Sequence, residues 1–301
     1  MIPQILKSTD LQLITPCFCA GAHQTEPELR AASFRGELRW WFRCLGGSRE
    51  LENTVFGNVH GACRASAVAL RVLNVKRSPV SGWGFEGGGG NPKQPNSSYI
   101  TYFLNANEKN GAEDKVVRSE AWLPPDQKFT LELRQLRELE PAALELLNLA
   151  WDCLCNLGAI GARKTRALGA YAPVNPAEQK VPELIAHATV RQHFFIKSAG
   201  NKDFGDFRSP AVTTSLLTAC ARRLKEYRGD LGIHPTLGKG QKAREGAYYG
   251  ISALGNAMGG RQTSALRFRP VLIENKLFLY VLKAPDITLG AEARKHNLVL
   301  H

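Results

Sequence analysis

The sequence predicts an α+β protein made of two domains with antiparallel sheets. The chain has 301 residues, enough for two ordinary domains, and 44% of them are hydrophobic, enough for each domain to bury a core. Each half opens with a strand pattern that is followed by an amphipathic helix pattern. Two later strand patterns are separated by only two residues, the spacing of a hairpin and therefore of antiparallel strands.

The first half is predicted to contain four strands and two helices. The strands are expected at 11–18, 67–75, 99–104 and 129–133. The first helix is expected to begin after an N-cap at Ser33 and to end at Gly46. Its apolar stripe consists of Phe34, Leu38, Trp41 and Leu45. The second helix is expected to run from Pro141 to Gly158, and the Gly-rich residues 81–98 are expected to form a mobile loop.

The second half repeats this plan after a linker that is expected at 172–182. A strand at 193–197 precedes a helix with Ser209 as its N-cap, Pro210 in its first turn and Gly229 as its stop. The hairpin follows, with strands at 266–273 and 276–282. Periodicity does not give the order of the strands within either sheet.

The composition indicates a polyanionic partner and no membrane segment. Lys and Arg number 39 against 27 Asp and Glu, a net charge of +12. No apolar run of about 18 residues occurs and the first thirty residues lack a signal-peptide pattern, so we expect a cytoplasmic protein. Seven cysteines fit reduced thiols, and the pairs Cys17/Cys19 and Cys153/Cys155 lack the spacing of a zinc site. We expect no metal and no cofactor.

Two basic segments are candidates for binding nucleic acid. Within SFRGELRWWFRCLGG, a ridge of arginines recurs every four residues on one side of the helix: Arg35, Arg39 and Arg43. Guanidinium groups can hold phosphates, and Trp40, which lies off the apolar stripe, can stack on a base. The alternative, a solvated helix face with Trp40 in the core, stays open.

The second segment, Gly158–Gly169, carries Arg163, Lys164 and Arg166 and no acid. It is close to a phosphate-binding P-loop, but it follows a helix instead of a strand and has a bulky Arg where backbone must approach phosphate. We expect a loop that clamps a nucleic-acid backbone, against the alternative of a glycine cap with solvated charges. Arg261 belongs to a further basic cluster.

Catalytic motifs are absent from the sequence: it contains no HExxH, no GxSxG and no glycine-flanked carboxylate pair. A metal-independent ribonuclease needs only one well-placed histidine as general base, and His23 and His60 each stand beside glycine in expected loops. That enzymatic alternative therefore stays open.

The run from Leu13 to Gly47 resembles the opening of the RAMP superfamily, the RNA-binding subunits of type III CRISPR effector complexes, and especially the first Cmr subunits of type III-B complexes. The resemblance is carried by Thr15-Pro16, Glu28-Leu29-Arg30 and the segment 33–43. Phe56-Gly57 and the loop 158–169 match later elements of the family. The chain departs from the pattern at Phe42 and, in the loop, at Ala162 and Ala167.

The resemblance implies two tandem RRM-like (ferredoxin-type) domains, at 1–172 with the insertion 81–98 and at 183–301. It implies a non-catalytic subunit that holds the 3′ part of the crRNA and its target RNA at one end of the filament, beside other RAMP subunits. Within the family pattern, Arg30 joins the candidate RNA-binding residues. The alternatives are a RAMP-type, metal-independent endoribonuclease that processes guide RNA and an adaptor that only contacts proteins.

The residues also bear on how RNA is bound. No stretch fits the aromatic RNP pattern with which RRM sheets stack bases. We therefore expect backbone binding in one groove formed by both basic segments, which suits a guide of variable sequence.

Overall fold

The computed structural model describes residues 4–23, 26–59, 61, 63–76, 97, 100–101, 122–200, 202–230 and 264–285. In this part of the chain the strands form a four-stranded sheet, a three-stranded sheet and a two-stranded pair. Every strand pairing in these sheets is antiparallel. The predicted α+β class with antiparallel sheets is confirmed.

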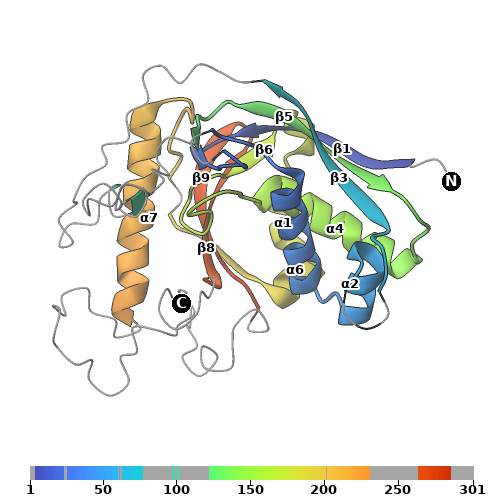
Figure 1. The fold of residues 1–301 in the computed structure, drawn as a ribbon. Coiled ribbons are helices and arrows are strands. Elements are labelled where there is room, and N and C mark those ends of the chain that lie inside the picture. The colour runs from blue at the N-terminus through green and yellow to red at the C-terminus, as the bar shows by residue number, and fades with distance from the viewer. Residues whose placement is uncertain are drawn as a thin grey trace, which may run out of the picture.

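The first half has one sheet with its helices on one face. Its elements are β1 (Gln4–Leu13), β2 (Cys17–Phe18), α1 (Ala31–Cys44), α2 (Arg49–Phe56), β3 (Val68–Lys76), β4 (Trp122–Leu123), β5 (Lys128–Gln135), α4 (Pro141–Leu157) and β6 (Tyr171–Pro173). The strand order is β3-β5-β1-β6, while β2 pairs with β4. Apart from β2, β4 and α2, the element order is βαββαβ, as in a ferredoxin-type unit. Helices α1 and α4 lie on the same side of this sheet (Figure 1).

The predicted apolar stripes form the core between helices and sheet. Phe34, Leu38 and Trp41 of α1 are fully buried, and Leu147 and Leu154 of α4 meet the same cluster. The inward residues of β5 alternate as expected, since Phe129, Leu131 and Leu133 are all buried.

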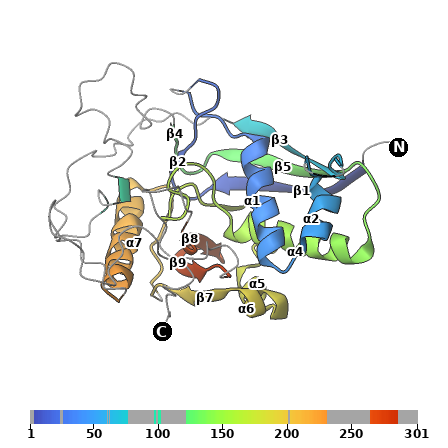
Figure 2. The same ribbon diagram turned by 60° about the horizontal axis from the view of Figure 1, so that its bottom comes forward.

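The second half follows with short helices and a second sheet. Its elements are η2 (Pro176–Glu178), α5 (Val181–Ala186), α6 (Ala188–His193), β7 (Phe195–Ser198), α7 (Pro210–Asp230), β8 (Leu266–Ile273) and β9 (Lys276–Lys283). The strand order is β7-β9-β8. Glu274 and Asn275 both have positive φ angles, 51° and 62°, as a two-residue hairpin turn requires. The long helix α7 stands along this sheet on the side away from α1 and α4 (Figures 1 and 2).

The two halves contact each other through β8, which touches α4 and β6. The backbone adds a bridge, because Phe268 N donates to Thr165 O at 3.1 Å and Ala167 N donates to Phe268 O at 3.3 Å. The loop 158–169, called the basic loop below, therefore lies at the junction of the halves.

Several expected boundaries differ from the structure. The strand expected at 11–18 is broken at residues 14–16, where Ile14 N and Thr15 N both turn to Ala170 O and Pro16 has no N–H to donate. The first helix begins at Ala31, so Ser33 lies inside it and Arg30 stands at the N-cap without a side-chain bond. The break in the strand arises from a contact with a distant segment, Ala170, that local patterns do not report.

The structure also bears on the linker expected at 172–182, on the strand expected at 193–197 and on the segments expected within 81–104. Residues 171–173 form the edge strand β6, which pairs with Leu11–Leu13, so the first sheet continues into the expected linker. The strand expected at 193–197 begins at Phe195, because α6 extends to His193. Of the strand expected at 99–104 the structure describes only residues 100 and 101, which are helical, and of the loop 81–98 it describes only residue 97.

Candidate nucleic-acid interface

The arginine ridge of α1 faces the neighbouring helix α2. Arg35 Nη2 donates to Phe56 O, and Arg39 and Arg43 both pair with Glu52 of α2. Glu52 is almost fully buried, whereas the side chains of Arg39 and Arg43 stay 38% and 52% exposed. Glu52 therefore offsets two of the three ridge arginines. The ridge attaches α1 to α2 and still presents guanidinium N–H groups to solvent.

Glu37 lies on the opposite side of α1 and is buried. Residues two apart on a helix point about 200° apart, so Glu37 faces away from Arg35 and towards the second half. It pairs with Lys164 of the basic loop and, at 2.9 Å, with the buried Arg267 of β8. Burial alone raises the Glu37 pKa, but Arg267, Lys164 and Arg269 outweigh burial and hold the pKa below its ordinary value.

Trp40 completes this contact between the halves. Its ring packs edge-on against Trp41 and Phe194, with ring centroids 5.0 and 5.8 Å apart. The Arg267 guanidinium carbon lies 3.3 Å from the centroid of the Trp40 ring. Trp40 thus packs between the two halves and stays half-buried, so the stacking of a base on it stays a prediction. We call the group Glu37, Trp40, Lys164, Arg166, Arg267 and Arg269 the seam.

Arg166 is buried in the seam, 5% exposed, and is not available on the surface. Its Nη1 donates to Leu266 O at 3.0 Å and to Ser264 Oγ at 3.3 Å. Burial lowers its pKa to about 10. Arg163 is half-buried, and burial lowers its pKa as well. Arg166 holds β8 and Lys164 pairs with Glu37 of α1, so the loop is less open than the clamp the sequence predicted.

The basic loop takes its shape from two glycines with left-handed backbone. Gly161 has φ +80°, and a Cβ there would lie 2.5 Å from Phe18 O. Gly169 has φ +65°, and a Cβ there would lie 1.8 Å from Ile160 O. Ala162 N donates to Phe18 O at 2.7 Å, which fixes the loop against β2.

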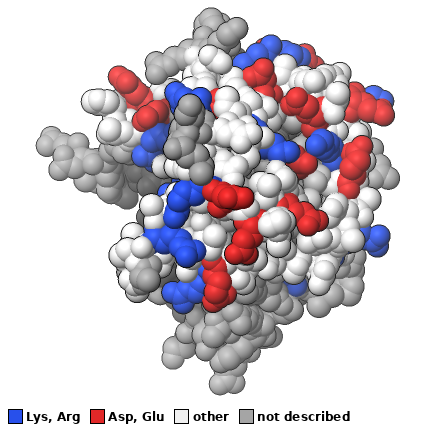
Figure 3. Space-filling view, turned by 90° about the vertical axis from the view of Figure 1, so that its right-hand side faces the viewer, with Lys and Arg blue, Asp and Glu red and all other residues white. Residues whose placement is uncertain are grey.

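The two basic segments do not converge on one groove. The ridge lies on the α2 side of α1, and the basic loop lies on the Glu37 side. Arg30, at the start of α1, is exposed and forms no ion pair with the described residues. The surface view from the right of Figure 1 shows basic and acidic side chains interspersed (Figure 3). Arg261 lies outside the described residues.

The open face of the first sheet is polar instead of aromatic. Thr130 Oγ1 donates to Asp10 Oδ1 at 2.6 Å, and Glu132 pairs with Arg134 at 2.6 Å and with Arg71 at 3.7 Å. Aromatic residues that would stack bases on an RRM sheet do not occur on this part of β5. This agrees with the expectation that bases are not read by sheet stacking.

Sequence patterns missed the acids and cations that join elements. Glu52 was not connected to the ridge, and the burial of Arg267 and Arg269 was not predicted. The burial of these arginines is indicated by the sequence LRFRPVLI, in which two arginines occupy alternate positions of an otherwise apolar strand. Arg269 is fully buried, which lowers its pKa to about 9, and its Nη1 donates to Lys164 O.

The histidines and cysteines bear on the predictions about catalysis and metal binding. They contain no group of three or more His, Cys, Asp or Glu side chains that could hold a metal ion. His23 is exposed, and His60 lies outside the described part of the chain. The seven cysteines are free thiols, and burial raises the pKa of Cys44 to about 12. None of the helices in the described ranges is long and apolar enough to span a bilayer.

Comparisons with known proteins agree with this architecture. A family model described as "RAMPs: RAMP superfamily" matches residues 10–172. The CRISPR system Cmr subunit Cmr1-1 of Pyrococcus furiosus is 27% identical over 167 residues, which cover 52% of this chain and 44% of that protein. Cmr1-2 of the same organism is 36% identical over 80 residues, 24% of this chain and 42% of that protein. The aligned part thus spans less than half the length of these curated relatives.

A solved structure extends the likeness of fold to nearly the whole chain. One chain of "Cryo-EM structure of the Type III-B Cmr-beta bound to cognate target RNA" matches with a TM-score of 0.50. The match covers 94% of both chains at 12% identity. At this identity the likeness concerns the fold.

Proposed function

The chain belongs to the RAMP superfamily, and from this we propose that it is a non-catalytic RNA-binding subunit of a type III CRISPR effector complex. The observation that carries the proposal is the family match over residues 10–172, because this range holds both α1 and the basic loop. The curated relatives are named as Cmr subunits, which favours a type III-B particle.

The proposal includes a position and partners. We assign the subunit to one end of the filament, where it holds the 3′ part of the crRNA with its target RNA beside other RAMP subunits in the cytoplasm. We also assign two tandem RRM-like domains to the chain. This assignment is supported by the βαββαβ order of the first half and by the strand order β7-β9-β8, which repeats the first three strands of such a unit.

The proposed binding mode is contact with phosphates. The N-terminal end of α1 has no acid in its first turn and no side-chain cap, so its free N–H groups and Arg30 favour an anion. Arg39 and Arg43 extend the basic surface along α1, and Lys164, one-third exposed, adds a charge beside the basic loop. Such contacts position RNA without reading its sequence.

Filter binding with two single-stranded RNAs of unrelated sequence tests this mode. The full chain is expected to bind both with similar Kd, and Arg30→Ala or Arg43→Ala is expected to weaken both to the same extent. Lys276→Ala is the matched control, because Lys276 is an exposed cation at the start of β9, directly after the hairpin turn. Binding of one RNA alone, or variants that affect only one, would contradict backbone recognition.

The non-catalytic part of the proposal has its own test. The exposed His23 stands in a loop of the first half, so a guide-processing ribonuclease remains the second candidate. The purified chain is incubated with repeat RNA in the presence of a chelator. We expect the RNA to stay intact. Site-specific cleavage that is lost in His23→Ala would replace our proposal with the ribonuclease.

A further inference from the structure

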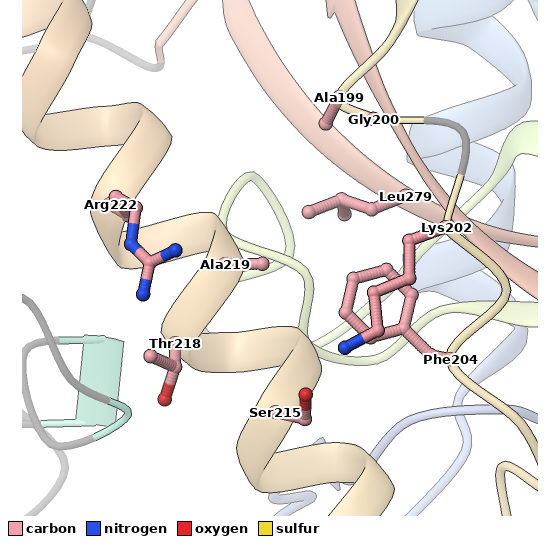
Figure 4. Close-up of a pocket in the computed structure, with 9 residues that line it drawn as sticks. All are labelled: Ala199, Gly200, Lys202, Phe204, Ser215, Thr218, Ala219, Arg222 and Leu279. Atoms are coloured by element: carbon pink, nitrogen blue, oxygen red, sulfur yellow. The ribbon is translucent and has the colours of Figure 1, made fainter.

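A pocket of about 310 Å³ lies in the second half, far from α1 along the chain, between α7 and the segment that follows β7. Figure 4 shows Ser215, Thr218 and Arg222 on α7 across from Lys202 and Phe204. This volume lies at the lower end of the range for small-ligand sites. The sequence patterns gave no sign of it, because its two walls come from segments that only the fold brings together.

The lining combines an aromatic floor with cations and hydroxyl groups. Phe204 is half-buried and Leu279 is fully buried beneath the pocket. Ser215, Thr218 and Arg222 are spaced three and four residues apart, so α7 presents them on one face. The nine residues of the lining include no carboxylate. The chemistry therefore favours an anion that carries a flat apolar group.

The two cations of the pocket are available to a ligand. Arg222 is exposed and forms no ion pair with any residue that the structure describes. Lys202 Nζ rests over the Phe204 ring, 5.5 Å from its centroid. An exposed cation–π contact of this kind is weak, so the ammonium group can move to a phosphate while a base takes its place on the ring.

The wall opposite α7 is held in place before any ligand binds. Phe204 N donates to Leu277 O at 2.8 Å, and Ala199 N donates to Leu279 O at 2.8 Å. Arg223 of α7 donates from its Nε to Ala199 O at 3.1 Å. Both ends of the segment are thus bonded to β9, and Ala199 is also bonded to α7. The pocket therefore exists before a ligand binds.

We propose that this pocket holds one nucleotide of single-stranded RNA. The base stacks on Phe204, the phosphate is bound by Lys202 and Arg222, and the hydroxyl groups of Ser215 and Thr218 bond the sugar–phosphate. An aromatic ring serves any base, because every base has a π-face. The inference rests on the proposed function and deepens it, since it gives the second half its own contact with the bound strand.

The test measures the affinity of the full chain for single-stranded RNA in three variants. Phe204→Leu keeps an apolar side chain under the pocket but removes stacking, and it is expected to raise Kd about tenfold. Arg222→Ala is expected to make the negative slope of log affinity against log salt shallower by about 0.7, the share of one phosphate. Arg191→Ala, an exposed arginine of α6 outside the pocket, is the matched control and is expected to leave both values unchanged.

The outcomes separate this inference from the proposed function. If wild type binds RNA and both pocket variants bind with the same Kd and salt slope, the pocket assignment is wrong and the proposed function stands. If wild type has no affinity for RNA, both are wrong. Uridine monophosphate is added as a competitor in a further arm. Full competition at micromolar concentration would assign the pocket to a free nucleotide and overturn its assignment to an RNA strand.

Discussion

Glu37 is a buried carboxylate that pairs with two cations from different parts of the chain, Lys164 and Arg267. Arg267 is only 2% exposed, so the loss of its counter-charge leaves an uncompensated guanidinium in the interior. We predict that Glu37→Gln lowers the free energy of unfolding by about 3 kcal/mol. Urea denaturation measures this change. Glu145→Gln on the exposed side of α4 is the control and is expected to change it little.

The same carboxylate predicts a dependence of stability on pH. Its pKa in the folded state lies below the ordinary value, so its contribution is fully present above the unfolded-state pKa of about 4.3. That contribution is lost as pH falls through the folded-state pKa. The difference in unfolding free energy between wild type and Glu37→Gln should be constant from neutral pH to about pH 5 and shrink below about 4.3. A free-energy difference between wild type and Glu37→Gln that grows below about pH 4.3 would contradict the pairing of an ionised Glu37 with Lys164 and Arg267.

For single residues, the sequence predicted which side chains share a helix face but not which residues they pair with. The four-residue period of Arg35, Arg39 and Arg43 correctly placed them on one side of a helix. Glu52, the carboxylate that pairs with Arg39 and Arg43, lies on α2. Tertiary packing decides that α2 lies against this side of α1. Arg166 shows the same limit, because a positive charge in a sequence does not report whether its segment is buried by a strand about a hundred residues later.

The basic loop gives a prediction for a single element. Gly169 has φ +65° and no room for a Cβ beside Ile160 O. Gly169→Ala is therefore expected to lower the melting temperature by several degrees, since the backbone must shift. Gly36 in α1 has nothing within 4 Å of a Cβ, so Gly36→Ala is expected to raise stability by about 0.5–1 kcal/mol. Differential scanning calorimetry compares the two, and equal effects would contradict this description of the loop.

The bounds of helices and strands were predicted best where turn and cap residues next to them in the sequence determine these bounds. The hairpin strands were placed to within one residue, because Glu274 and Asn275 adopt the left-handed turn that their position between two apolar runs indicates. Helix α4 has its expected ends at Pro141 and Leu157. The break in the strand expected at 11–18 depends on Ala170, which accepts from Ile14 and Thr15 across more than 150 residues. No local pattern contains such a contact.

In the described part of the chain, the four-stranded sheet of the first half meets the three-stranded sheet of the second half where β8 contacts α4, β6 and the basic loop. The order of strands in the first sheet is β3-β5-β1-β6, and periodicity does not supply it. The pairings of β1 with β5 and with β6 join residues over a hundred positions apart. The expectation of one groove lined by both basic segments is wrong, because Glu37 draws the basic loop to the side of α1 that the ridge does not occupy. We therefore propose that phosphate contacts are distributed over several places, from Arg30 and the ridge to the pocket beside α7.

The salt dependence of RNA affinity tests the central claim, that this chain binds the RNA backbone through its cations. The Kd of the full chain for a single-stranded RNA is measured at several salt concentrations. We predict a straight line of log affinity against log salt with a slope of about −0.7 for each phosphate contacted, and therefore clearly steeper than −1 for two or more contacts. An affinity that does not change with salt would contradict the account.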